Sequence, residues 1–428
     1  MRMNFLDTVL RFLCVACPKI IWGVAMVVLN ILVMPLLGKE GFGAYAIAQT
    51  LVLFLSEGLL GAAVDLGVLR YASLHWPSDN ERASGVERAA LHWKLCFAAC
   101  TGICTLVLAG QISEWLFHSR HQQQLVWSIW AAANGMLLHG SALVYLQSRC
   151  RFVQFGLFDL AQVLVKVIGI VATILYWRYG GHSGSELSPA YVLSWFAVGP
   201  WFAFFAFYFS PIGRPLRKAA VDARSQHELL HVAGWNLATF SLTALGSRID
   251  IFFLTSLGTL SEVSRFAAAQ TLALIPQLLG TYIGVVMSPQ IMPRYTAGTF
   301  RPLLARSQVT LGAVGGLMLA LGWWGTNAVI AGIMPDTFAD AAPVVRVLLP
   351  SAVASFTTFP LIVAFLMFVR PRFIISMEIV LLPLVAAAHA WAIPRWGAVG
   401  AAFVTSIFII GKSIAAWLIA FRWADRAR

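Results

Sequence analysis

The residues best suited to chemistry in this chain are charged side chains within long apolar stretches. The cations are Lys19, Lys166, Arg248, Arg265, Arg346 and Lys412, and the anions are Glu57, Asp65, Asp159, Asp250 and Glu378. A charge that faces lipid is costly, so such residues usually face a cavity or a partner side chain. Cations placed in this way can hold an anionic ligand, because Arg offers a planar fork of donors and Lys a point charge.

Two roles are expected for these charges. We expect the substrate to be bound by Arg248, Lys166, Lys412, Arg346 and Arg265. A carboxyl group removed from water can carry a proton, so the expected ion-coupling residues are Asp250, Glu57 and Glu378. The pattern does not choose between a proton and sodium as the coupling ion. For each charge, an internal ion pair that neutralises itself is the competing interpretation.

A polar face marks one of the apolar segments. Asp159, Gln162 and Lys166 stand at positions i, i+3 and i+7. In an α-helix this spacing puts the three side chains on one face. We expect that face to point into the protein.

The composition indicates whether the elements that carry these charges lie in water or in lipid. The chain has 428 residues, of which 59% are hydrophobic and 11% are charged, and its mean hydropathy is +0.79. Soluble domains carry roughly 25% charged residues. The composition therefore excludes a soluble enzyme, a disordered chain and a secreted disulfide scaffold, and predicts an all-α polytopic membrane protein.

Twelve apolar stretches are long enough to span a bilayer as helices. They are residues 12–37, 43–69, 91–110, 125–148, 156–177, 191–209, 229–257, 263–290, 303–333, 343–369, 373–393 and 398–421. Strands of a membrane barrel would alternate apolar and polar residues. These stretches do not alternate, so a barrel is not expected.

The basic residues predict the orientation of these spans. With the N-terminus in the cytoplasm, 20 of the 30 Lys and Arg residues fall on the cytoplasmic side and four on the outside. This asymmetry is typical of membrane proteins and places both termini in the cytoplasm. Because it accounts for nearly all of the net charge of +12, no nucleic-acid partner is expected.

An internal repeat divides the spans into two sets. Residues 46–53 match residues 267–274 at six of eight positions, in the second and eighth spans. Parallel repeats of this kind form two lobes around a central cavity. We expect an N-terminal lobe of six helices over residues 1–210, a cytoplasmic linker over 211–228 and a C-terminal lobe of six helices over 229–428.

Several motifs resemble those of one transporter family. Pro35–Ala46 (PLLGKEGFGAYA) and the later Asp65–Gly67 resemble the first-loop and second-helix signatures of bacterial polysaccharide flippases. Arg248–Leu254 resembles the seventh helix of that family, and Glu262 with Phe266–Ala269 resembles its eighth. This family belongs to the superfamily of multidrug, oligosaccharidyl-lipid and polysaccharide exporters. The family usually has Gly and Tyr where this chain has Ser264 and Phe266, so these motifs indicate the fold more strongly than the substrate.

The resemblance implies a flippase for O-antigen or exopolysaccharide repeat units in a bacterial inner membrane. It would move a polyprenyl-pyrophosphate-linked oligosaccharide from the cytoplasmic to the outer leaflet, as a monomer, with polysaccharide polymerase machinery as a further expected partner. A cation-coupled multidrug antiporter of the same superfamily is the alternative. The sequence has no phosphate-binding loop, nucleophilic triad or loop cluster of metal ligands, so neither an enzyme nor a cofactor or metal is expected.

Overall fold

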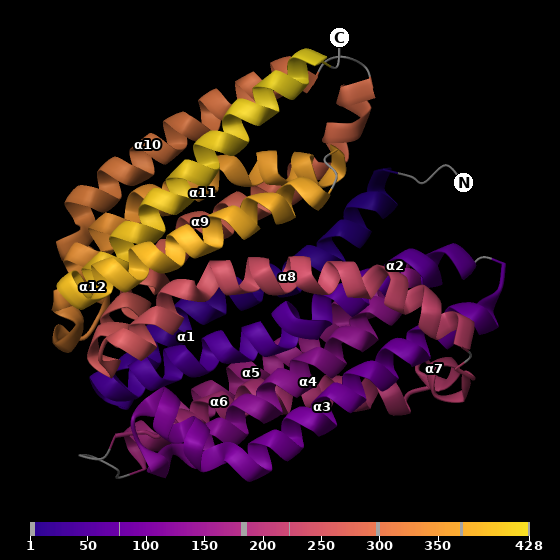
Figure 1. The fold of residues 1–428 in the computed structure, drawn as a ribbon, viewed down its shortest axis with the longest axis horizontal. Helices are drawn as coiled ribbons and strands as arrows, with labels where there is room; N and C mark the ends of the chain where they lie inside the picture. The colour runs from indigo at the N-terminus through magenta and orange to yellow at the C-terminus, as the bar shows by residue number, and fades with distance from the viewer. Residues whose placement is uncertain are drawn as a thin grey trace. The chain divides into compact units, whose positions relative to one another are not determined.

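The computed structural model describes residues 5–76, 78–180, 186–221, 223–296, 300–368 and 371–426. These segments are helical almost throughout (Figure 1). The elements are α1 (Phe5–Leu53), η1 (Phe54–Gly61), α2 (Ala62–His75), α3 (Asn80–Phe117), η2 (Arg120–Gln122), α4 (Gln123–Ser148), α5 (Phe152–Tyr179), α6 (Pro189–Phe209), α7 (Arg214–Lys218), α8 (Ala223–Leu257), α9 (Leu260–Thr296), α10 (Phe300–Ile333), η3 (Asp336–Ala341), α11 (Ala342–Phe368) and α12 (Pro371–Arg426).

Two of the helices each contain a sharp break at a glycine. In α1 the break is at Gly38, with φ 66°, and in α12 it is at Gly397, with φ 53°. Both angles lie in the left-handed region, which glycine adopts without steric cost. The first predicted span therefore ends at Gly38, and the second continues through η1 and α2. The last two predicted spans are the halves of α12, and the other eight correspond to α3–α6 and α8–α11.

Length and composition support a membrane location for these helices. Among the described residues, 8 helices are long and apolar enough to cross a membrane, or up to 9 if the bent pair Asn236–Gly246 and Ile249–Leu257 is one span. This count is lower than twelve partly because it treats each broken helix, such as the 60-residue segment Ala16–His75, as one. The prediction of an all-α polytopic membrane protein is thus supported.

The chain packs as two compact units. Unit 1 consists of Met1–Leu29 and Leu36–Arg248, and unit 2 of Asn30–Pro35 and Ile249–Arg428. The contacts thus group the predicted linker and the first part of α8 with the N-terminal helices. The division into lobes at residues 210 and 229 stays a prediction, and the two units are described separately below.

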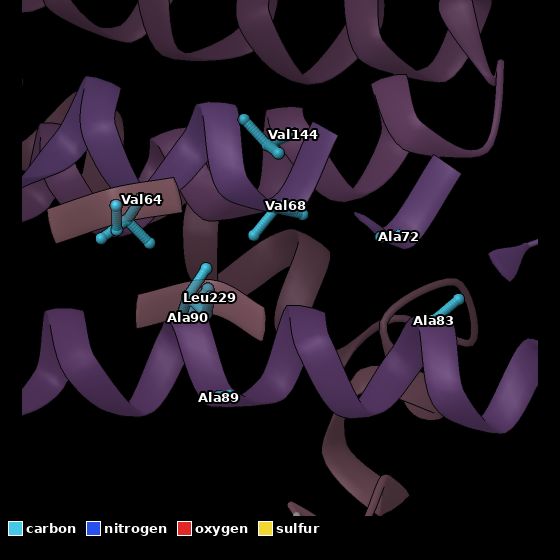
Figure 2. Close-up of a cluster of buried hydrophobic side chains, with 9 residues drawn as sticks. Val64, Val68, Ala72, Ala83, Ala89, Ala90, Val144 and Leu229 are labelled. Atoms are coloured by element: carbon cyan, nitrogen blue, oxygen red, sulfur yellow. The ribbon is translucent and has the colours of Figure 1, made fainter. Parts of the chain in front are cut away.

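The first part of α8 belongs to unit 1 because it covers an apolar cluster there. Leu229 and Ala233 of α8 pack with Val64 and Val68 of α2 and with Ala90 of α3 (Figure 2). Small residues let these helices approach closely, as is usual between membrane helices. At Gly67, for example, an added Cβ would lie 2.9 Å from Leu229 Cδ1.

The two copies of the sequence repeat have the same environment in their respective units. In residues 46–53 the first three side chains are buried, and the following five alternate between half-buried and buried. Residues 267–274 show the same succession. The match in burial supports the register of the repeat, because residues that merely share a composition would not keep one buried face in phase.

Candidate substrate cavity

Unit 1 encloses a cavity of about 580 Å³ that is lined by charged and polar side chains. Its walls come from the first part and the last residue of α1, from η1, from the start of α2, from the second half of α4 and from the first half of α5. The ionisable residues in the lining are Lys19, Glu57, Asp65, His139, Asp159 and Lys166. The volume falls in the range typical of small-molecule sites.

Lys166 is the most enclosed cation of this cavity. Its side chain is 1% exposed, and Nζ lies 4.5 Å from the ring centroid of Trp22 and 5.7 Å from that of Phe196. Helix α6 leaves room for the lysine at Gly199, because an added Cβ there would lie 2.7 Å from Lys166 Cγ. Lys166 makes no ion pair among the described residues. Its ammonium is held by aromatic faces and remains available to an anion.

The predicted polar face of α5 does line the cavity. Gln162 Nε2 donates to Asp159 Oδ1 at 3.0 Å, and both side chains are buried beside the cavity together with Lys166. His139 of α4 also lies near Asp159, with Nε2 3.8 Å from Asp159 Oδ1. This distance is too long for a hydrogen bond and suits an ion pair when the imidazole is protonated.

Glu57 is positioned by an irregular turn in the second span. It lies in η1, a π-helical segment, and its side chain lines the cavity. The π geometry depends on Gly61, where an added Cβ would overlap the carbonyl oxygen of Ser56. Lys19, Lys166 and Arg248 are the cations that attract the Glu57 carboxylate. Such π-helical turns often occur at functional sites.

Asp65 also borders the cavity, but its charge has a fixed partner. Lys94 Nζ donates to Asp65 Oδ1 at 2.5 Å and to the carbonyl oxygen of Leu137 at 3.2 Å. Lys94 is 0% exposed. Lys94 is thus an interior residue that neutralises a carboxylate.

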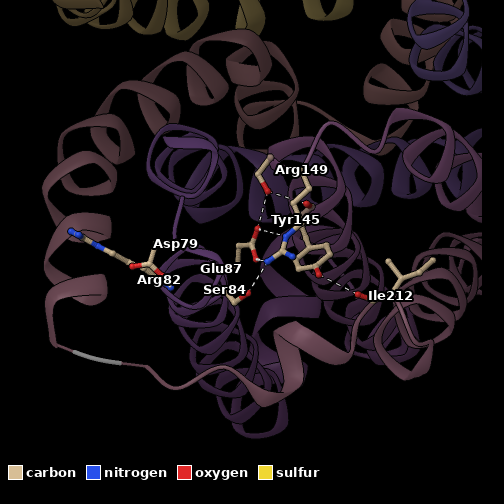
Figure 3. Close-up of polar contacts among 8 residues, drawn as sticks. Asp79, Arg82, Ser84, Glu87, Tyr145, Arg149 and Ile212 are labelled. Atoms are coloured by element: carbon tan, nitrogen blue, oxygen red, sulfur yellow. Dashed lines mark hydrogen bonds and ion pairs between the residues drawn. The ribbon is translucent and has the colours of Figure 1, made fainter. Parts of the chain in front are cut away.

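A second buried pair joins α3 to the end of α4. Arg149 Nη2 donates to Glu87 Oε2 at 2.9 Å and to Ser84 Oγ at 2.7 Å (Figure 3). The guanidinium also lies over the rings of Trp76 and Tyr145, with Cζ 4.5 Å and 4.2 Å from their centroids. The side chain of Arg149 is 2% exposed, so this pair serves packing within unit 1.

In unit 2 the predicted substrate residue Lys412 and the predicted coupling residue Glu378 bind each other. Lys412 Nζ donates to Glu378 Oε1 at 2.8 Å and to Oε2 at 3.0 Å. Asp250 is buried, and its Oδ2 accepts a hydrogen bond from Thr405 Oγ1 at 3.3 Å. The internal ion pair that the sequence left open is therefore present for Lys412.

The remaining predicted cations have local contacts. Arg265 Nε donates to the carbonyl oxygen of Asp340 at 2.6 Å, and Arg346 Nη2 donates to Asn327 Oδ1 at 3.0 Å. Arg248 is half-buried at the end of unit 1 and makes no ion pair among the described residues.

Of the eight predicted site residues, the structure brings only Lys166 and Glu57 into the cavity of unit 1. Sequence reasoning missed two contributors, Trp22 as the ring beneath Lys166 and the π-helical turn that carries Glu57. The two glycines at 58 and 61, which follow a single glutamate, were the available signal for the turn. Nothing in the spacing of Trp22 indicated its role.

Comparison with known proteins identifies the fold. No family model and no curated protein matches this sequence. Among solved structures, the lipid II flippase MurJ in an inward closed conformation aligns with a TM-score of 0.73 and 13% identity, over 96% of this chain and 87% of that one. An inward-facing multidrug resistance transporter of the MATE family aligns with a TM-score of 0.72 and 14% identity, over 97% and 98% of the two chains.

A third similar structure is a transporter of the MOP superfamily from Pyrococcus furiosus, with a TM-score of 0.66 and 13% identity over 97% of this chain and 95% of that one. At these identities the likeness establishes the fold alone. The chain therefore has the fold of MOP-superfamily transporters, which a lipid flippase and multidrug transporters share. The narrower resemblance to polysaccharide flippases is neither supported nor opposed by these alignments.

Proposed function

We propose that this protein is an alternating-access flippase for a polyprenyl-pyrophosphate-linked oligosaccharide. It moves the lipid-linked saccharide from the cytoplasmic to the outer leaflet of a bacterial inner membrane, and both of its termini are cytoplasmic. The fold supports transport rather than enzymatic chemistry, because each of the similar structures is a transporter or flippase. We further propose that it acts as a monomer and supplies polysaccharide polymerase machinery.

The observation that carries this proposal is the free ammonium of Lys166 in the cavity wall. A lysine that is buried yet lacks a carboxylate partner is costly, so an anionic ligand would offset that cost when it enters. A pyrophosphate group has the charge to do so, and the neighbouring Gln162 can donate to its oxygens or to sugar hydroxyls. Lys19 is a second cation in the cavity lining, and Arg248 belongs to the same unit.

Ion coupling is assigned to Glu57 in the same proposal. Its carboxylate shares the cavity with Lys166, so substrate and coupling ion would compete for one electrostatic environment. Such competition is a direct way to link the two binding events. Lys412 with Glu378, together with Asp250, would have a corresponding role in unit 2.

The decisive test is deletion of the gene followed by analysis of polyprenyl-linked saccharides. Complete repeat units should accumulate inside the cell while surface polysaccharide is lost. Complementation with Lys166→Ala should fail at normal protein levels, whereas Lys166→Arg should keep part of the export. Arg120→Ala is the matched control, because Arg120 is an exposed cation that pairs with Glu114 outside the cavity. Full export by Lys166→Ala would refute the cationic-cavity mechanism.

A multidrug antiporter is the second candidate, favoured by the carboxylates of Glu57 and Asp159 in the same cavity. Cationic drugs would bind such groups directly. Deletion would then increase susceptibility to cationic drugs and leave saccharide carriers unchanged. A drug-susceptibility panel that is the same with and without the gene would eliminate this candidate.

A further inference from the structure

We propose that the surface where α6 meets α7 is a binding site for an anionic phospholipid of the surrounding bilayer. The site consists of a ladder of aromatic rings on α6 and a group of uncompensated cations at the end of that ladder. It lies outside the cavity of unit 1, and the proposal does not depend on what the cavity transports.

The aromatic ladder provides the apolar part of the site. Trp201 and Phe205 stack with ring centroids 5.4 Å apart and an interplanar angle of 26°, and Phe205 and Phe209 stack at 6.0 Å and 22°. The spacing of four residues puts the three rings in one row along the helix. Phe205 is 45% exposed and Phe209 66% exposed, although α6 is a candidate membrane span. The row therefore presents a continuous apolar surface to acyl chains.

The cations lie where this row ends. Arg217 of α7 places its Cζ 5.9 Å from the ring centroid of Phe209 and 5.7 Å from that of Tyr208. Arg88 of α3 contacts the same tyrosine, since its Nη1 donates to the Tyr208 hydroxyl at 3.1 Å. Two guanidinium groups from separate helices are thus fixed around one tyrosine.

These positive charges lack a counter-charge in the part of the chain that the structure describes. Neither Arg88 nor Arg217 makes an ion pair there. Glu87, beside Arg88 in sequence, is already bound to Arg149. Arg214 and Lys218, at the two ends of α7, are exposed and add to the same charge. Arg88 Nε donates to His92 Nε2 at 3.1 Å, so this neighbour accepts a hydrogen bond and supplies no negative charge.

The arrangement suits a phospholipid rather than a free anion. Exposed cations next to a bilayer attract anionic headgroups, and guanidinium groups bind phosphate oxygens in pairs. Leu216, at 1% exposed, anchors α7 against the helices and keeps Arg217 near the end of α6. A single lipid can therefore place its phosphate between Arg217 and Arg88 and lay an acyl chain along Phe209 and Phe205.

The test is lipid retention by the purified full-length protein, measured by native mass spectrometry with phosphatidylglycerol or phosphatidylcholine as the added lipid. The wild type should retain phosphatidylglycerol more strongly than phosphatidylcholine. Removing one cation should weaken retention about fivefold, and Arg88→Ala/Arg217→Ala together roughly twentyfold. Arg120→Ala, which removes an exposed cation elsewhere, should leave the preference unchanged.

A second arm tests the apolar part and does not depend on the arginine variants being stable. Phe209→Ala removes an exposed ring and should reduce retention of both lipids, whereas Phe202→Ala removes a ring of similar exposure that lies outside the ladder and should not. Equal binding of the two lipids by the wild type would overturn the proposal. So would an unchanged preference in a folded double arginine variant, or displacement of the lipid by millimolar inorganic phosphate.

Discussion

Lys412 donates hydrogen bonds to both carboxylate oxygens of Glu378, and the pair links the two halves of α12 across the break at Gly397. Glu378 is buried, while Lys412 is 29% exposed at its side chain. The ion pair should therefore contribute to the stability of the protein, independently of any role of the two residues in transport.

Glu378→Ala should destabilise the protein because it leaves the Lys412 ammonium without its counter-charge. Lys412→Ala/Glu378→Ala should recover part of that loss, with a coupling free energy of about 1–2 kcal/mol between the two positions. Thermal unfolding of the purified protein measures both values. A coupling free energy near zero would show that the pair contributes nothing to stability, and export by the stable double variant would exclude an essential role in coupling.

Composition and the apolar runs predicted the helical architecture well, for reasons that the structure makes clear. Apolar runs must span a bilayer as helices, because only a helix satisfies its backbone polar groups within lipid. The breaks at Gly38 and Gly397 fall in the connections that the sequence placed between spans. The repeated octapeptides have matching burial because a buried helix face constrains residue size at each position.

The candidate site could be predicted only in part, because pairing depends on distances between helices that the sequence does not give. Lys166 was expected to line a central cavity between two lobes, and it lies in a cavity that is lined by residues of unit 1. Nothing in the sequence indicated that Lys94 and Arg149 are buried, because a cation near a helix end has the same sequence pattern whether its side chain reaches water or a buried carboxylate. Only the structure, which places Asp65 and Glu87 on facing segments, shows that the two cations form buried ion pairs.

Arg149→Met should cost about 3–5 kcal/mol of stability, because it strands the Glu87 carboxylate in a site that excludes water. The side chains of both residues are 2% exposed, so solvent cannot take the place of the guanidinium. Arg149→Met/Glu87→Leu should be more stable than Arg149→Met alone. The control is Arg120→Met, where the arginine side chain is 72% exposed and the loss should be within about 0.5 kcal/mol. Thermal unfolding that is equal for Arg149→Met and Arg120→Met would contradict the burial seen here.

Trp22→Ala should impair export under the proposed function while leaving the protein folded. The indole lies against the Lys166 ammonium, and a desolvated contact of this kind contributes about 1–2 kcal/mol. We therefore expect a severalfold loss of export for Trp22→Ala and a smaller loss for Trp22→Phe. Trp324→Ala is the matched control, because Trp324 is 81% exposed and lies outside the cavity. Equal export by the Trp22 and Trp324 variants would remove Trp22 from the site.

Gly397→Ala should destabilise unit 2 by about 1–2 kcal/mol, because its positive φ is costly for any residue with a Cβ. The added methyl group would also overlap the carboxylate of Glu262, which accepts a hydrogen bond from the Ala398 N–H at 2.5 Å. Gly411→Ala, in the same half of α12, meets no atom within 4 Å and should instead stabilise by about 0.5–1 kcal/mol. Unfolding midpoints that shift in the same direction for both variants would contradict this assignment.

Gly61→Ala should separate function from stability in unit 1. Because a Cβ at this position would overlap the Ser56 carbonyl, the variant should relax the π-helical turn toward an ordinary α-helix. One residue of register turns a helix by about 100°, which would rotate Glu57 away from the cavity. Export should fall while the unfolding midpoint changes little. Gly110→Ala, where the nearest atom is 3.5 Å away, is the control for a new methyl group on a membrane helix. Wild-type export by Gly61→Ala would show that transport does not require the π-helical position of Glu57.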